Sequence, residues 1–546
     1  MLRHCVRRTS PLSRRWTRAL FQSAADKPSY ITTPIFYPNA VPHIGHLYSL
    51  VIADIFARYS RLRHPEKPTY FLAGTDEHGI KIQRAAEARG EEPLAFCDTL
   101  SAQFRRLSQA ADISHTVFMR TTSEHHHRAV VDVWKRLDAK GLIYKAAYAG
   151  WYSVSDECFY TDAQVESAPD PKDPTKTIMI STETKNAVEW SSEENYMFRL
   201  SAFQDALLKH YKSGADANGT SSSPTRIYPP QAHAQVVDIL ENAPLADLSI
   251  SRPRSRLSWG VPVPGDPEHS IYVWFDALLV YLSGVGYPFK QDVVGKFDKE
   301  AVTRSGWPPN LQVIGKDILR FHALYLPAVL VALNFPLPGR LLSHGHWTVE
   351  GRKMSKSLGN VADPFDAMER HGVDCVRYYL ARVGGKFRDD LGCVLLGARQ
   401  AIDAKMMISK EQVLSALATD DPLHELHAAA RALPQQVEER LLEMDVAGAV
   451  THITEALKLL NKIFGDVAPF QKTTSSDAAY NLHVVSVDLL RVVGICLQPF
   501  APKAAGVVLD ALRVPETRRS WQDAQRSEGV DALAVERGVR IFPPTQ

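Results

Sequence analysis

Residues Tyr30–Arg58 read YITTPIFYPNAVPHIGHLYSLVIADIFAR, and this stretch decides the fold. It begins with an apolar, β-branched segment, Tyr30–Thr33, which predicts a strand. A loop rich in proline follows and ends at Pro42. From His43 onward, apolar residues recur at intervals of three and four, which predicts a helix. A strand, a tight loop and a helix N-terminus form the phosphate-facing half of a nucleotide-binding α/β unit.

The first turn of that helix carries two histidines, His43 and His46, with Gly45 between them. Because helix residues three apart lie on one face, both rings can direct N–H groups at phosphate oxygens. The helix dipole favours an anion at the same place, and a residue without Cβ lets the ligand approach the backbone. Taken alone, the quartet is more often a simple helix start, so its function depends on the other motifs.

The composition is typical of a soluble protein with more than one domain. The chain has 546 residues and a net charge of +2, and a local basic stripe on such a protein is compatible with nucleic-acid binding. No apolar run approaches the length of a membrane span. The six cysteines are scattered without a C-x-x-C pair, which argues against a disulfide scaffold or zinc knuckle and favours a reducing compartment.

The first 25 residues differ in kind from the rest of the chain. They contain six arginines, several serines and threonines, and no acidic residue before Asp26. Together with spaced apolar residues, this composition predicts a mitochondrial transit peptide. The alternative is a disordered basic tail that contacts RNA.

A second strand, Pro68–Ala73, is expected to end in Gly74–Gly79, which reads GTDEHG. Open α/β sheets bind ligands at the carboxyl ends of parallel strands, so Asp76 is placed to hold a substrate ammonium group. The alternative is that Asp76 caps the following helix, expected over Ile80–Gly90.

Residues 94–140 look helical and end at Gly141. Within them, His125–His127 invites a metal-site interpretation. Adjacent helical residues point in different directions, so three in a row cannot all bind one ion. We therefore expect these histidines at the surface.

Residues 144–258 change to short β-like segments between polar loops, which predicts an insertion between two halves of the nucleotide-binding fold. Gly214–Pro230 is a connector rich in glycine, serine and proline. Cys158 is the only cysteine of this segment, so no structural zinc is expected.

The α/β pattern resumes with strand-like segments at Ser270–Asp276 and Leu311–Ile314. Three residues in or just after these segments can line an apolar pocket, namely Trp274, Tyr281 and His322. An aromatic-lined pocket suits a polarisable thioether. Taken singly, each of these residues is more often part of a core.

A basic loop lies between Gly351 and Gly359 and carries Lys353, Ser355 and Lys356. Ammonium groups on a mobile loop can follow phosphate charge that moves during a reaction. The alternative is a solvated basic loop. From about Asp389 the chain is helical, and its three–four apolar spacing predicts a helix bundle.

In order and spacing, these motifs resemble the methionyl-tRNA synthetase family, in its mitochondrial or bacterial-like branch. The resemblance runs from Tyr30 to about Asp390 and more loosely through the C-terminal helices. Two signatures are common to class I synthetases, His43–His46 and Lys353–Ser357. The motifs that select methionine are Thr33–Tyr37, Gly74–Gly79, Tyr272–Ala277 and Gly315–Asp317.

The resemblance implies an α/β fold, with a Rossmann-like parallel-sheet catalytic domain split by a small β-rich insertion and followed by an all-α helix bundle. The expected boundaries are a transit peptide at 1–25, the first catalytic half at 26–143, an insertion without zinc at 144–258, the second catalytic half at 259–345, a signature-loop and stem-contact segment at 346–390, and an anticodon-binding bundle at 391–546.

The resemblance also implies a reaction: L-methionine and ATP, with Mg²⁺, give methionyl-adenylate, and the methionyl group passes to tRNA(Met). The implied ATP-binding residues are His43, Gly45, His46, Lys353, Ser355 and Lys356, of which the two histidines and two lysines are the catalytic set. The implied methionine-binding residues are Ile35, Tyr37, Asp76, Trp274, Leu278, Tyr281 and His322. Relatives often have proline at the position of Leu278. Phe470, where relatives have tryptophan, is expected to stack on an anticodon base. The protein is expected to act as a monomer in the mitochondrial matrix.

Two other interpretations stay open. One is a synthetase for another amino acid, although the insertion is shorter than the editing insertions of leucyl, isoleucyl and valyl enzymes, and the zinc-binding cysteines of cysteinyl enzymes are absent. The other is a catalytically silent, synthetase-like RNA-binding protein, against which the two intact signatures argue. A dehydrogenase is excluded because no G-x-G-x-x-G follows the first strand.

Overall fold

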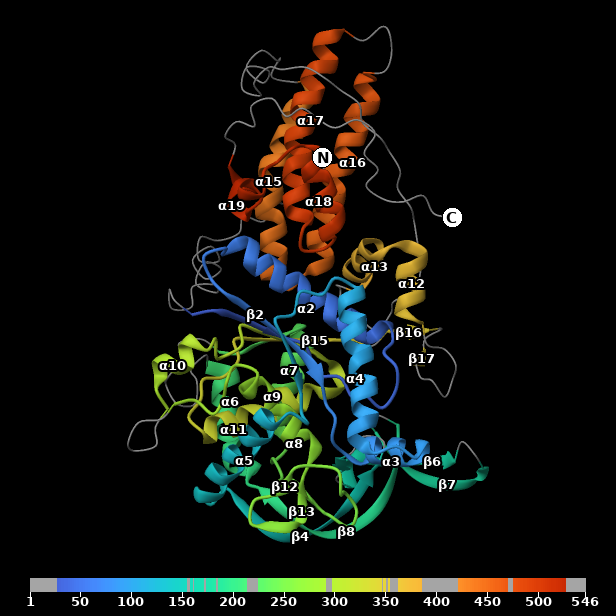
Figure 1. Cartoon of the computed structure of the whole chain (residues 1–546), viewed down its shortest axis with the longest axis vertical. Coiled ribbons are helices and arrows are strands. Elements are labelled where there is room, and N and C mark those ends of the chain that lie inside the picture. Colours follow the sequence, from blue (N-terminus) through green and yellow to red (C-terminus); the bar gives the residue numbers. More distant parts are fainter. Residues whose placement is uncertain are drawn as a thin grey trace, which may run out of the picture.

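The computed structural model describes residues 27–154, 158–160, 162–170, 173–182, 185–213, 224–290, 297–345, 347–349, 352–353, 362–384, 421–469 and 475–526. Several predictions lie outside these residues, namely those on the presequence 1–25, Ser355, Lys356 and Phe470. Along the long axis of the molecule, a β-rich end, an α/β middle and a helical end follow one another (Figure 1).

The middle layer is built on a parallel sheet with the strand order β3-β2-β1-β14-β15-β9. Its strands are β1 (Ser29–Thr32), β2 (Thr69–Thr75), β3 (Val117–Arg120), β9 (Arg226–Tyr228), β14 (Leu311–Gly315) and β15 (Arg340–His344). All neighbouring pairs are parallel. The order changes direction between β1 and β14, so the carboxyl ends of these two strands are the topological switch point where such sheets bind ligands. The predicted Rossmann-like sheet is confirmed.

The first half of this layer supplies the helices α2 (Ile44–Arg63), α3 (Ile80–Arg89), α4 (Pro93–Ala110) and α5 (Glu124–Ala139). The expected continuous helix over 94–140 is wrong, because β3 interrupts it as an edge strand. Four residues between two amphipathic helices are too few to show a strand period. After α5, Gly141 has a φ of 66°, a left-handed conformation suited to ending a helix.

The β-rich end is an antiparallel sheet with the order β5-β4-β8-β7-β6, to which β10 adds on β8. Its strands are β4 (Ile143–Ser153), β5 (Cys158–Tyr160), β6 (Val165–Asp170), β7 (Asp173–Ser181), β8 (Ala187–Phe198) and β10 (Leu248–Ser249). A smaller sheet follows, with β13 (Asp266–Ile271) between β11 (Ser251–Pro253) and β12 (Pro262–Val263). The insertion is therefore β-rich, as predicted.

One predicted boundary is wrong. The insertion was expected to run unbroken over 144–258, yet β9 pairs with β15 inside the parallel sheet. The helices around it are α6 (Gln204–Ser213) and α7 (Pro230–Asn242). A three-residue edge strand next to a connector rich in proline gives no pattern that a sequence can reveal.

The second half of the α/β layer adds α8 (Val273–Leu278), α9 (Val280–Ser283), α10 (Lys299–Arg304), η3 (Lys316–Ile318), η4 (Phe321–Tyr325) and α11 (Leu326–Ala332). The strand expected over Ser270–Asp276 ends at Ile271, and the remainder is the first turn of α8. A short continuous apolar run does not distinguish a buried helix from a buried strand.

Beyond β15, the two short strands β16 (Thr348–Val349) and β17 (Arg352–Lys353) pair with each other. Next come α12 (Pro364–His371), α13 (Val373–Tyr379) and η6 (Leu380–Gly384). The helical end contains α15 (Pro422–Leu442), α16 (Val446–Val467), α17 (Ser476–Leu497), α18 (Pro502–Ala511) and α19 (Trp521–Gln525). The predicted bundle is confirmed.

The bundle shares its apolar core with the α/β layer. Val450, Ile453 and Leu489, which follow the predicted spacing, are buried in the same cluster as Val51 and Phe56 of α2. A second cluster fills the other side of the parallel sheet. In the described part of the chain, no helix is long and apolar enough to cross a membrane.

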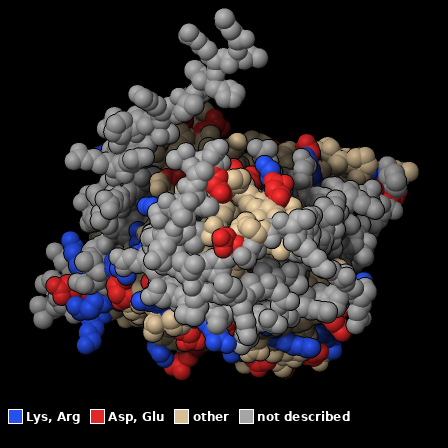
Figure 2. All heavy atoms as spheres, turned by 90° about the horizontal axis from the view of Figure 1, so that it is seen from above, with Lys and Arg blue, Asp and Glu red and all other residues tan. Residues whose placement is uncertain are grey.

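Seen from the bundle end, basic and acidic side chains are interspersed along the visible lower rim of the molecule (Figure 2). This mixture agrees with the net charge of +2.

Candidate active site

The two predicted histidines form a reciprocal cap at the start of α2. Nδ1 of His43 accepts a hydrogen bond from the Gly45 N–H (3.1 Å), and Nδ1 of His46 accepts one from the His43 N–H (3.1 Å). Their rings stack with centroids 3.8 Å apart. Because each Nδ1 is an acceptor, each neutral ring carries its proton on Nε2, the atom that can donate to an anion.

The position of this histidine pair is fixed by its neighbours. Phe36 and Phe104 contact the His46 ring edge to face, at centroid distances of 5.2 and 5.1 Å. A Cβ at Gly45 would lie 2.9 Å from Cε1 of His43, so any side chain there would displace the ring. Gly45 is thus required by the histidine cap itself, in addition to the ligand approach expected from the sequence.

The chain on both sides of the basic signature loop is described. Lys353 is the last residue of β17, and the Ala362 carbonyl accepts a hydrogen bond from the Ile44 N–H (3.2 Å). The first turn of α2 and the end of the signature loop are therefore joined. Ser355 and Lys356 lie between these two points, outside the described residues.

The end of β2 presents two adjacent acids in different environments. Glu77 is fully buried and accepts hydrogen bonds from Thr75 (2.6 Å), Thr122 (2.5 Å) and Arg120 (2.7 Å). Asp76 is only half-buried, and its N–H donates to the Phe36 carbonyl (2.8 Å). The buried acid anchors the loop, and Asp76 next to it is less enclosed.

Tyr281 and His322 form a neutral, buried hydrogen-bond chain. The Tyr281 hydroxyl donates to Nε2 of His322 (2.8 Å), and Nδ1–H of His322 donates to the Ile318 carbonyl (2.9 Å). Burial lowers the pKa of His322 to about 4. Burial, and then the Asp76 carboxylate, raise the pKa of the Tyr281 hydroxyl. Asp76 is therefore electrostatically coupled to the Tyr281–His322 pair, which carries no charge near neutral pH. We call this pair and the side chains beside it the methionine wall.

The Trp274 ring completes the wall. It packs against Phe321 and Tyr325 of η4, with centroids 5.7 and 5.2 Å apart. Leu278 and Tyr281 belong to the same apolar cluster, and Ile35 and Trp274 pack against it. Four of the predicted methionine residues, from the β1 loop, α8 and α9, therefore lie in or against the apolar cluster on one side of the parallel sheet.

Tyr37 is placed differently from the rest of the predicted set. Its ring packs against the small cluster between α3 and α4, and its hydroxyl donates to the His78 carbonyl (2.8 Å). It therefore supports the loop that carries Asp76.

Sequence reasoning missed a buried cluster around Asp276. Its carboxylate oxygens bind Nδ1 of His78 (2.6 Å) and Nε2 of His126 (2.8 Å), and Nδ1 of His126 contacts the Ser283 hydroxyl (2.8 Å). Burial alone would raise the pKa of Asp276, but the two histidines hold it well below its usual range. This cluster links the Asp76 loop to α8, α5 and α9.

The expectation that His125–His127 lie at the surface is wrong for the middle residue. His126 is fully buried, whereas His127 is exposed. On α5, Ala129, Val130 and Val133 continue the same buried face. That three–four spacing from His126 is the signal that would have identified it as an inward-facing residue.

A small pocket lies beside the Asp76 loop and is lined partly by Gly79, Tyr152, Arg252 and Tyr272. The Arg252 guanidinium lies 4.1 Å from the Tyr272 ring centroid and 5.2 Å from that of Tyr152. None of the predicted methionine residues lines this pocket. Two of them, Tyr281 and Leu278, are packed to 2% and 6% exposure.

Comparisons with known proteins identify the family. Residues 29–393 match the family described as tRNA synthetases class I (M). A probable mitochondrial methionine–tRNA ligase of Neurospora crassa is 40% identical, over 92% of this chain and 82% of that protein. The mitochondrial methionine–tRNA ligase of Homo sapiens is 39% identical, over 91% of this chain and 86% of that protein.

The solved structures give the same result. The crystal structure of Mycobacterium tuberculosis methionyl-tRNA synthetase bound by methionyl-adenylate superposes with a TM-score of 0.77 at 32% identity, and it covers 95% of this chain and 100% of that one. With such identity and coverage over nearly its whole length, this chain belongs to the methionine–tRNA ligases of the class I tRNA synthetase family.

Proposed function

We propose that this protein activates L-methionine with ATP to methionyl-adenylate and then transfers the methionyl group to tRNA(Met) in mitochondria. The observation that carries the proposal is the pairing of two features. A histidine pair at the start of α2 carries its protons on Nε2, and a neutral aromatic wall is electrostatically coupled to Asp76. The first suits phosphates, and the second suits an amino acid with an apolar side chain.

On the methionine side, Asp76 binds the substrate ammonium group. The substrate side chain is surrounded by Ile35, Trp274, Leu278, Tyr281 and His322. Tyr37 supports the loop that carries Asp76. Because both ring nitrogens of His322 are hydrogen-bonded, this side chain presents no free donor to the thioether. A polarisable sulfur next to aromatic rings is favourable.

On the ATP side, His43 and His46 donate from Nε2 to phosphate oxygens, and Gly45 lets the ligand approach. Lys353, Ser355 and Lys356 close over the phosphates of ATP, which enters as its Mg²⁺ complex. A methionine carboxylate oxygen attacks the α-phosphorus in line, the bond from this phosphorus to the bridging oxygen breaks, and pyrophosphate leaves. Positioning and stabilisation of phosphate charge supply the catalysis.

In the second step, a ribose hydroxyl of the terminal tRNA adenosine attacks the methionyl carbonyl, and AMP leaves. The helical end holds the tRNA, with Phe470 stacking on an anticodon base. The domain limits are those expected from the sequence, with the return of β9 to the parallel sheet as the one change. We infer that the protein works as a monomer without zinc, and metal analysis of the purified protein tests the latter.

The relatives from Neurospora crassa and Homo sapiens are named as mitochondrial ligases. Residues 1–25, rich in arginine and free of acids, act in this proposal as the signal for import into the matrix. A fusion of Met1–Asp26 to a fluorescent reporter should enter mitochondria. A diffuse cytosolic signal would contradict that role.

Methionine-dependent exchange of pyrophosphate into ATP tests the proposed function, followed by charging of tRNA(Met). Exchange should require methionine and should not be supported by valine or isoleucine. Exchange with another amino acid would assign the chain to another synthetase. Absence of exchange together with retained tRNA binding would favour the silent RNA-binding protein, an alternative that the ligase names of the relatives oppose.

A further inference from the structure

Helix α2 joins the histidine pair to the helical end of the molecule. One turn past the pair, the Tyr48 hydroxyl donates to the Gly384 carbonyl of η6 (2.5 Å). At the far end of α2, Tyr59 and Arg63 both donate to Glu438 of α15, at 2.8 and 2.7 Å. The helix that presents His43 and His46 is therefore held along its length by later parts of the chain.

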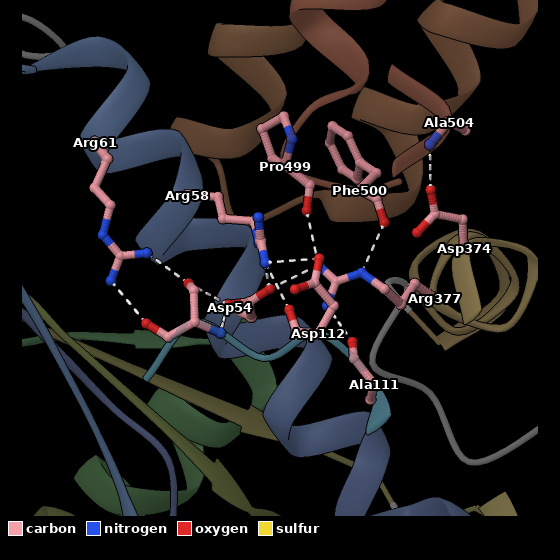
Figure 3. A network of polar contacts seen from close by, with 11 residues as sticks. Asp54, Arg58, Arg61, Ala111, Asp112, Asp374, Arg377, Pro499, Phe500 and Ala504 are labelled. Atoms are coloured by element: carbon pink, nitrogen blue, oxygen red, sulfur yellow. Dashed lines mark hydrogen bonds and ion pairs between the residues drawn. The ribbon is translucent and has the colours of Figure 1, made fainter. Parts of the chain in front are cut away.

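Arg377 makes the most extensive of these connections. It lies on α13 and is fully buried. Its Nη2 donates to Oδ2 of Asp54 on α2 (2.7 Å) and to the Pro499 carbonyl (3.1 Å), and its Nε donates to the Phe500 carbonyl (3.2 Å). Its Nη1 donates to the carbonyl of Ala111 at the end of α4 (3.2 Å). One guanidinium thus binds the α/β layer and the turn between α17 and α18 (Figure 3).

The partner of this guanidinium is equally fixed. Asp54 is fully buried, and Oδ1 accepts from the N–H and hydroxyl of Ser114 (2.8 and 2.6 Å), while Oδ2 also accepts from Nε of Arg58 (2.8 Å). Burial alone would raise the pKa of Asp54, but Arg377 and Arg58 lower it. The pair therefore stays charged.

A second contact also joins α13 to the bundle. Oδ2 of Asp374, on the first turn of α13, accepts from the N–H of Ala504 on α18 (2.5 Å). Both contacts are directional. A buried ion pair adds little stability compared with a well-packed apolar pair of similar volume, so its distinctive contribution is to fix how the bonded parts are oriented.

The orientation of the bundle relative to the α/β layer bears most directly on the second reaction step. Adenylate formation involves small substrates inside the α/β layer. Transfer requires a tRNA that is held by the bundle and delivers its acceptor end to the adenylate. A misplacement of about 1 Å between reacting groups can cost up to roughly a hundredfold in rate.

We propose that Arg377 is a positioning residue that keeps the helical bundle in register with α2, so that a tRNA bound to the bundle presents its terminal adenosine to the adenylate. This inference rests on the proposed function. It assigns to Arg377 a role in the transfer step that substrate contacts do not provide, because the side chain is wholly enclosed by protein.

The test is Arg377→Lys, which keeps a positive charge opposite Asp54 but loses the planar fork that reaches three carbonyls. Concentrations are normalised by active-site titration. Pyrophosphate exchange without tRNA should stay within about threefold of wild type, whereas single-turnover transfer from preformed adenylate to saturating tRNA should fall by about 10- to 100-fold. The KM for tRNA should change little, because the bundle still binds it.

Arg491→Lys is the matched control. Arg491 is also buried, at 5% exposure, but its bonds to Asp488 (3.0 Å) and the Asp523 carbonyl (2.8 Å) stay within the helical end. This variant should lower thermal stability to a similar extent and leave the ratio of transfer to exchange unchanged. Should Arg377→Lys fail to fold, Asp374→Ala is the second test of the positioning role. It removes the contact with α18 and should lower the transfer rate while leaving exchange unchanged.

Equal loss of exchange and transfer, or unchanged transfer, would overturn the positioning role and leave Arg377 as a purely structural residue. A wild-type protein without methionine-dependent exchange would instead refute the proposed function, so the two failures are distinguishable.

Discussion

The two halves of the candidate site both use histidine beside aromatic rings, but in opposite ways. At the start of α2, His43 and His46 are half-buried, and backbone N–H groups occupy their Nδ1 atoms. In the methionine wall, His322 is buried, and both of its nitrogens bond to other groups of the protein. The first arrangement directs donors at an anion, and the second hides them from an apolar ligand.

This difference shows how one residue type acquires opposite functions from its surroundings. The ATP-facing pair depends on local chain geometry, because both caps form within four consecutive residues. The wall depends on the tertiary fold, because its members come from α8, α9 and η4. We therefore expect substitutions to affect the two halves differently, in activation rate on one side and in amino-acid selectivity on the other.

The largest expected effect is that of Asp76→Ala. Removing the charge that pairs with the substrate ammonium should cost about 4 kcal/mol, roughly a thousandfold in kcat/KM for exchange. Methionine, norleucine and leucine should lose activity alike, since all share the ammonium group. Asp238→Ala, at an exposed carboxylate whose hydrogen bond to Asn242 (2.7 Å) stays within α7, is the control and should be near wild type. A change in side-chain preference would contradict the assigned role.

Lys356→Ala tests the phosphate side. A donor that acts on charge developing in the transition state contributes about 3 kcal/mol to the barrier. Adenylate formation should slow by roughly a hundredfold with the KM for methionine nearly unchanged, and Lys353→Ala should have a smaller effect in the same direction. Pre-steady-state adenylate formation is the measurement. Normal turnover with weakened methionine binding would exclude this role.

The sequence alone supports the local half of the comparison far better than the tertiary half. His43, Gly45 and His46 form a contiguous motif, so their spacing predicts a shared face. Trp274, Tyr281 and His322 were suggested from the residues, but only the family resemblance assigned them with Ile35 and Leu278 to one pocket, because periodicity does not show that α8 and η4 meet. The cluster around Asp276 escaped notice for the same reason, since His78 and His126 reach it from separate elements.

The second kind of feature that the sequence did not reveal is a short strand at the edge of the sheet. β3 and β9 lie at the two edges of the parallel sheet, and neither is long enough to show a period of two. In contrast, the long helices α16 and α17 follow their predicted apolar spacing. Length alone does not decide the outcome, since the four-residue β1 was predicted from its β-branched run before a proline-rich loop.

The neutral state of His322 predicts a pH effect on stability. Its folded pKa is about 4, against an ordinary value of 6.5, so the unfolded chain takes up a proton first as the pH falls. Stability is unaffected above about pH 6.5 and is lost progressively down to about pH 4, with a loss of about 2 kcal/mol at pH 5. Thermal unfolding of wild type and His322→Gln at pH 7.5 and 5 measures this loss of stability. The variant should lose less stability between the two pH values than wild type. Equal losses would show that His322 is protonated in the folded protein at pH 5.

The smallest expected effect is on selectivity, through Trp274→Ala. An apolar pocket distinguishes ligands that differ by one group by only about 1–3 kcal/mol, so losing one aromatic face should reduce discrimination between methionine and leucine by about 1 kcal/mol, roughly fivefold. Exchange kinetics with methionine, norleucine and leucine measure the change, and Trp151→Ala in the insertion is the matched control. Because the Trp274 ring contacts Phe321 and Tyr325, Trp274→Phe should recover part of the selectivity. If Trp274→Ala left preference untouched while Asp76→Ala altered it, the two roles would be exchanged and the wall would have to be rebuilt from other residues.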